Sequence, residues 1–143
     1  MLAEKVDYVI GVDTHRDQHT FAVVAAPSGA VVAQQSVRSD RHGYREALRV
    51  AERHAAGARV WAVEGAGHYG AGFTRYLLEQ GESVLEAGRG ARSERRLHGK
   101  NDTLDALRAA RSALAAEALT LPRSGERQEA LRVLLPSATR RAM

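Results

Sequence analysis

Cysteine is absent from this chain of 143 residues, which excludes disulfide bonds and zinc sites built on thiolates. Long apolar runs are absent too, since no stretch approaches the ~20 residues that a helix needs to cross a bilayer. The first residues, MLAEKVDYVIGVD, place no basic region ahead of a long apolar segment, so we expect no signal peptide. These absences favour a protein of the cytoplasm with no membrane partner.

Lysine is scarce, because 19 of the 21 basic residues are arginine. The net charge is +4 and the isoelectric point is about 10.0. The planar arginine fork binds two phosphate oxygens at once, so this composition suits a phosphate-bearing partner. An arginine-rich genome would produce the same composition, and the placement of the arginines has to decide. Hydrophobic residues make up 44% of the chain, which is ordinary for one globular domain.

Apolar runs bounded by turn residues predict an alternation of strands and helices. The expected strands are Val6–Val12, Thr20–Ala26, Ala30–Val37, Arg59–Val63 and Ser83–Glu86. The expected helices are Arg41–Ala55, Tyr69–Gln80 and Asp102–Ala118, and a further amphipathic helix runs from Glu126 to Leu135. Short links make the first three strands an antiparallel meander, while crossover helices make the later strands parallel. This order predicts an α/β, ribonuclease H-like (RuvC-like) fold, a mixed five-stranded sheet flanked by helices. The actin-like ATPase fold shares that core, so topology alone does not choose a chemistry.

Four acidic residues occupy positions that favour a common site. Asp13 and Glu64 end two strands that are neighbours in the predicted sheet, and open α/β sheets place their sites at that carboxyl edge. Asp102 and Asp105 are three residues apart and share a helix face. Four crowded carboxylates need a hard divalent cation such as Mg²⁺ or Mn²⁺, and two such ions can hold a phosphodiester. Each residue also has an ordinary explanation: a turn cap, a solvated strand end, a favourable first helical turn, or an ion pair with Arg108.

Two further clusters accompany the acidic residues. His15, Asp17 and His19 follow Asp13 at alternate positions, but no fourth ligand stands at a familiar zinc spacing, so we interpret His15 as an accessory polar group. A basic loop precedes the helix that begins at Asp102. Its cations are Arg89, Arg92, Arg95, Arg96 and Lys100. A solvated loop is one interpretation, and contact with a nucleic-acid backbone beside the carboxylates is the other.

The segments GVDTHRDQH, VEGAGHYG and KNDTLDA resemble the three motifs of the DEDD transposases of the Piv/MooV type, the insertion sequence one-ten family. The resemblance runs from about Tyr8 to Leu135. It implies a RuvC-like domain whose metal-binding tetrad matches Asp13, Glu64, Asp102 and Asp105. It also implies DNA as the partner in excision, insertion or inversion, a structured guide RNA, and a homo-oligomer of the full-length parent. A second domain of the family carries a catalytic serine.

The chain departs from the family pattern at three places. Arg16 stands where lysine is usual, and the segment EAGRGAR lacks the usual Asn-Pro. We expect no serine domain within these 143 residues, and we interpret neither Ser124 nor Ser137 as its nucleophile. We therefore expect residues 1–120 to form the catalytic domain and 121–143 to begin a truncated helical linker. We expect the isolated chain to be inactive or weak.

Three alternative functions stay open at this point. A stand-alone RuvC-like nuclease, such as a Holliday junction resolvase, would need only the carboxylates. An actin-like ATPase fragment would use GVDTH as a phosphate loop, although His15, Arg16 and Asp17 are not the small residues that wrap a phosphate. A non-catalytic remnant would bind nucleic acid alone.

Overall fold

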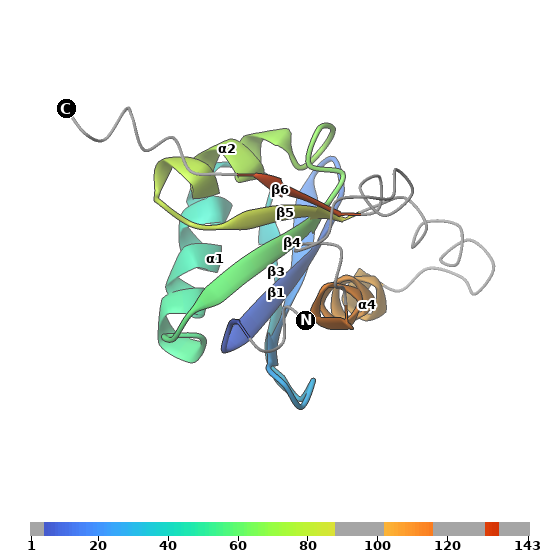
Figure 1. The fold of residues 1–143 in the computed structure, drawn as a ribbon. Helices are drawn as coiled ribbons and strands as arrows, with labels where there is room; N and C mark the ends of the chain where they lie inside the picture. Colours follow the sequence, from blue (N-terminus) through green and yellow to red (C-terminus); the bar gives the residue numbers. More distant parts are fainter. Residues whose placement is uncertain (1–4, 88–101, 116–130, 135–143) are drawn as a thin grey trace.

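The computed structural model of the chain describes residues 5–87, 102–115 and 131–134 (Figure 1). The elements in chain order are β1 (Tyr8–Thr14), β2 (Gln18–Ala25), β3 (Val31–Arg38), α1 (Arg41–His54), β4 (Arg59–Glu64), α2 (Ala71–Glu79), β5 (Val84–Ala87), α4 (Asp102–Ala115) and β6 (Leu131–Leu134).

The strands form one sheet in the order β3-β2-β1-β4-β5-β6. The pairs β1–β2 and β2–β3 are antiparallel, whereas β1–β4 and β4–β5 are parallel. The predicted meander and the predicted parallel strands are therefore both confirmed. This topology confirms the α/β, ribonuclease H-like fold, because the parallel strands β1 and β4 meet at the centre of a mixed sheet.

One prediction was wrong. A helix was expected from Glu126 to Leu135, but Leu131–Leu134 form β6, which pairs antiparallel with β5. Four residues are too few for apolar periodicity to distinguish a strand from a helix. The pairing with β5 joins segments far apart in the sequence, which no local pattern reveals. The division of the chain at residue 120 stays a prediction, since 116–130 lie outside the described residues.

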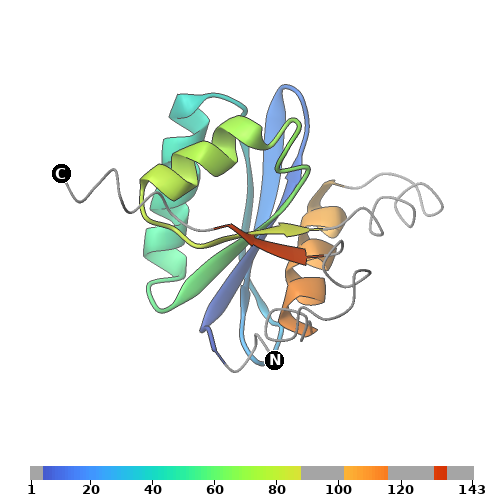
Figure 2. The ribbon, with the colours of Figure 1, turned by 45° about the horizontal axis from the view of Figure 1, so that its top comes forward.

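Helices cover the two faces of the sheet unequally (Figure 2). On one face α1 and α2 pack over large side chains, among them Phe21, Trp61 and Phe73. On the other face α4 packs over small and medium side chains such as Val9 and Ala62. The inner side of α4 is itself made of small residues, with Ala106, Ala109, Ala110 and Ala113 buried. No helix in the described residues is long and apolar enough to span a membrane.

The structure confirms two helix boundaries that the sequence predicts, the start of α1 and the end of α2. Asp40 caps α1 by accepting a hydrogen bond from the Gly43 amide at 2.9 Å. That hydrogen bond, with help from the nearby Arg38, lowers the pKa of the Asp40 carboxyl below its usual range. Gly81 follows α2 with a φ of +86°, a conformation that glycine adopts without strain.

A half-buried ion pair holds β4 to the start of β5. The Arg59 guanidinium donates two hydrogen bonds of 2.9 Å to the Glu82 carboxylate. Glu82 also accepts a 2.8 Å hydrogen bond from the Trp61 indole. Because the side chains of Arg59 and Glu82 are only 15% and 13% exposed, water replaces little of this network.

Candidate functional site

Two of the predicted carboxylates lie side by side at the carboxyl edge of the sheet. Asp13 of β1 and Glu64 of β4 are partners in the parallel register. Side chains alternate along a strand, so each carboxylate shares a face with the residues two positions before it. Those preceding residues include Ala62, which packs under α4. Asp13 and Glu64 therefore both face the α4 side, where they are 1% and 4% exposed.

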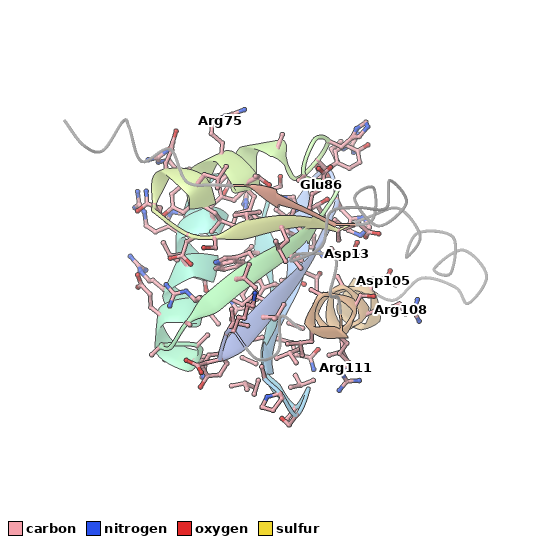
Figure 3. All side chains as sticks on the ribbon, viewed as in Figure 1. Asp13, Arg75, Glu86, Asp105, Arg108 and Arg111 are labelled. Carbon is pink, nitrogen blue, oxygen red and sulfur yellow. The ribbon has the colours of Figure 1, made fainter. Side chains whose placement is uncertain are left out.

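A glycine in β1 brings α4 to this edge. A Cβ atom at Gly11 would collide with the carbonyl oxygen of Ala106 and would come within 2.9 Å of the Ala110 Cβ. Only glycine allows the helix backbone to approach this closely. Asp105 precedes Ala106 and is 6% exposed. Figure 3 shows Asp105 and Arg108 on α4 near the end of β1 that carries Asp13.

Neighbouring polar groups contact the three carboxylates or their backbone. The Nε2 atom of His15 lies 3.0 Å from Oδ2 of Asp13. Arg108 pairs with Asp105 along α4, with 3.8 Å between Nη1 and Oδ1. The Thr14 hydroxyl donates a 2.6 Å hydrogen bond to the backbone carbonyl of Glu64, which ties the two strand ends together. His15 thus lies where an accessory group of the acidic cluster was predicted.

The donor chemistry of this edge fits a hard cation. Three buried carboxylates from β1, β4 and α4 offer only oxygen ligands, which Mg²⁺ and Mn²⁺ prefer. Among the described residues, no three or more acidic, histidine or cysteine side chains are grouped as a ready metal site. Asp102 begins α4, but its side chain is outside the described part. The structure thus places three of the four predicted residues at one edge without grouping them as a metal site, and the carboxylate set stays a prediction.

The His15–His19 cluster divides between the two faces of the sheet. Asp17 is exposed, and His19 is completely buried on the side of α1 and α2. Its ring stacks with those of Tyr44 and Phe73, at centroid distances of 6.1 and 5.7 Å. Burial lowers the pKa of His19 to about 4, so the ring is neutral at pH 7. His19 is therefore a core residue.

A tight turn follows Glu64 and exposes an aromatic side chain. Gly65 has a φ of +75°, and its carbonyl accepts hydrogen bonds of 2.9 Å from the amides of His68 and Gly70. A Cβ at Gly70 would lie 2.9 Å from both this carbonyl and the Thr14 methyl group. Tyr69, in this turn, is 55% exposed.

Sequence reasoning missed Gly11, Thr14 and the role of the turn. The signal for Gly11 was present, because a glycine inside an apolar strand often marks a close approach of another backbone. Thr14 gave no signal, since its partner is a backbone carbonyl 50 residues away. The basic loop from Arg89 to Lys100 lies outside the described residues, and its contact with nucleic acid stays a prediction.

Comparison with protein families gives one match that covers most of the chain. Residues 10–141 match a family model described as a transposase, of the DEDD type named for IS110. A search among curated proteins found no match.

Proposed function

The chain belongs to the IS110 family of DEDD transposases, and we propose that Asp13, Glu64, Asp102 and Asp105 form its metal-binding carboxylate set. The chain is a DNA transposase domain with a ribonuclease H-like fold. Neither a junction resolvase nor an actin-like ATPase finds support in the family match. The proposal concerns how this domain acts on a DNA phosphodiester, and which side chains do so.

The observation that carries the proposal is the burial of Asp13, Glu64 and Asp105 at one sheet edge. Burying a carboxylate costs several kcal/mol unless positive charge offsets it. Three elements nevertheless each deliver one carboxylate to this edge. A divalent ion bound there would add positive charge to this edge and would stabilise the negative charge on the attacking and leaving oxygens of a phosphodiester.

The remaining groups of the edge position these ligands. His15 contacts Asp13 and orients its carboxylate, while Arg108 limits the repulsion that Asp105 adds. The Thr14 hydrogen bond holds the ends of β1 and β4 in register. The first two roles act on a carboxylate, the third acts on the backbone, and none needs proton transfer.

The other parts of the proposal concern partners. The basic residues between Arg89 and Lys100 would contact the DNA backbone next to the carboxylates, since this loop precedes Asp102 directly. The family resemblance further suggests a structured guide RNA, assembly of several copies, and a serine nucleophile from a second domain. Strand transfer would need that nucleophile, because splitting one displacement into two steps requires a covalent intermediate.

Thermal unfolding with Mg²⁺ or Mn²⁺ tests the carboxylate set. An ion that binds only the folded domain raises the melting temperature in proportion to the logarithm of its concentration. We expect this rise in the unaltered chain and its loss in Asp13→Asn and Asp105→Asn, which keep the side-chain shape and remove a ligand charge. Asp7→Asn is the matched control, because Asp7 directly precedes β1, at the end of the strand far from Asp13, where its carboxylate accepts a hydrogen bond from the Ala58 amide.

Isothermal titration with Mn²⁺ provides the second readout of the same variants. Binding by the unaltered chain and by Asp7→Asn, with none by Asp13→Asn, supports the site. Equal binding by Asp13→Asn and the unaltered chain would refute it, and so would the absence of any binding to the unaltered chain.

A further inference from the structure

A row of four arginines follows the outer face of α1, on the opposite side of the sheet from the carboxylates. Its members are Arg41, Arg45, Arg49 and Arg53, spaced four residues apart, and all four are exposed. The inner face of the helix is defined by its buried residues, which are Gly43, Ala47, Leu48, Val50 and Ala51. At 100° per residue the arginine row runs across the middle of the outward face. We call it the α1 arginine row.

The row works against the stability of its own helix. Like charges four residues apart on a helix repel, and this row contains three such pairs in succession. Arg41 is the first residue of α1, where the helix dipole disfavours a cation, and the first turn carries no acidic residue. The dipole favours Arg53 in the last turn, but the three repulsive pairs and Arg41 remain, so helix stability does not explain the whole row.

Other contacts on the protein do not neutralise the row. In the part of the chain that the structure describes, none of these four guanidinium groups forms an ion pair. Arg41 stacks over the Tyr76 ring at 5.5 Å, a contact that orients the guanidinium and leaves its charge in place. Two acidic residues, Glu46 and Glu52, share the exposed side of the helix, and Glu46 accepts a hydrogen bond from Gln35. The outward face keeps a net positive charge.

We propose that the α1 arginine row is a second DNA-binding surface, which holds the phosphate backbone of duplex DNA away from the carboxylate edge. From the first to the last arginine there are 12 residue steps, or about 18 Å of helix, which corresponds to about five base pairs of duplex. Arginine forks match phosphate oxygens, and a regular row of them on a rigid helix suits a regular row of phosphates. Contacts of this kind position the duplex and do not select its sequence.

The α1 arginine row and the carboxylate edge lie on opposite sides of the sheet. The carboxylates lie on the α4 side of the sheet, whereas α1 covers the other side (Figure 2). DNA held by the row is thus a different stretch from the DNA at Asp13 and Glu64. The surface depends on the family's action on DNA, but it does not depend on the proposed metal ligands.

Fluorescence anisotropy with a labelled 25-base-pair duplex of arbitrary sequence, in EDTA, tests the row without metal. The variant Arg45→Gln/Arg49→Gln should weaken binding by at least about tenfold at 0.1 M salt and reduce the slope of log K against log salt by about 1.8. Arg111→Gln is the control, because Arg111 is exposed on α4 and donates to the Gly29 carbonyl, far from α1. It should change affinity less than the single variant Arg45→Gln, which alters the net charge equally.

A change of opposite sign provides an internal check. Glu52→Gln removes an acidic charge from the same helix face and should strengthen binding. Circular dichroism and thermal unfolding confirm that each variant is folded, and Mn²⁺ binding should be the same in Arg45→Gln/Arg49→Gln as in the unaltered chain. Unchanged affinity and slope in the double variant would overturn the proposal, as would an equal loss in Arg45→Gln and Arg111→Gln. Stronger competition by an RNA duplex than by unlabelled DNA would overturn the assignment to DNA.

Discussion

Asp13 and Glu64 stand opposite each other in parallel register, and the hydroxyl of Thr14 reaches across to the Glu64 carbonyl at 2.6 Å. The two carboxylates therefore share one rigid platform formed by the central strands of the sheet. The third carboxylate, Asp105, lies on α4, which packs against these strands. The strength of the site depends on how α4 meets β1.

Gly11→Ala should separate α4 from β1. The added methyl group would collide with the backbone of Ala106, and we expect a loss of about 3 kcal/mol in the free energy of unfolding because helix backbone cannot rotate aside. Urea denaturation measures the loss, and the rise in melting temperature caused by Mn²⁺ should shrink in the same variant.

Gly67→Ala is the control for this change. A Cβ at Gly67 meets nothing within 4 Å, so its effect should stay within about 0.5 kcal/mol. Equal stability of Gly11→Ala and Gly67→Ala would show that α4 does not depend on the close approach.

Acidification should destabilise the domain through His19. The unfolded chain binds a proton on this ring below pH 6.5, but the folded domain does so only below its pKa of about 4. The contribution of His19 to the free energy of unfolding is therefore fully present above pH 6.5, and it is lost as the pH falls from 6.5 to 4. The loss at pH 5 is about 2 kcal/mol relative to pH 7.5.

Urea midpoints at the two pH values, compared between variants, isolate this contribution. His19→Phe keeps an aromatic ring beside Tyr44 and Phe73 and should lower the pH dependence by about 2 kcal/mol. His42→Gln alters an exposed histidine of α1 and should leave it unchanged. The same pH dependence in His19→Phe and the unaltered chain would contradict the prediction.

Glu82→Gln should destabilise the join between β4 and β5. The change removes the charge that pairs with Arg59 in a half-buried setting, and we expect a loss of about 2 kcal/mol. Chemical denaturation should show almost no loss for Glu52→Gln on exposed α1. A double-mutant cycle with Arg59→Met measures the coupling, and a coupling energy near zero would show that the pair contributes nothing to stability.

Most of the fold could be predicted from the sequence because its signals are local. Asp13 and Glu64 were found by reading where apolar runs end, and Asp40 and Gly81 marked helix boundaries as capping chemistry requires. β6 could not be predicted, since its strand character comes from pairing with β5. The position of Asp105 depends on how closely the Gly11 and Ala106 backbones approach, a relationship between segments 95 residues apart in the sequence.

The two histidines after β1 show the same limit within a few residues. The alternate spacing of His15 and His19 after Asp13 predicted one cluster of polar side chains. The antiparallel register pairs Asp13 with Thr20, so His19 points to the opposite face of the sheet. A shift of one residue along a strand thus moves a histidine from the carboxylate face to the core face. Hydropathy does not reveal on which face it lies.

The alanine face of α4 limits the apolar area that holds this helix to the sheet. Because its inner side buries mainly Ala106, Ala109, Ala110 and Ala113, α4 gains less apolar burial than the layer of α1 and α2. We therefore expect α4 to detach first in any partial opening of the domain. Such an opening would withdraw Asp105 from Asp13 and Glu64. If these carboxylates form the proposed metal site, a ligand that bridges α4 to the sheet would favour the closed state.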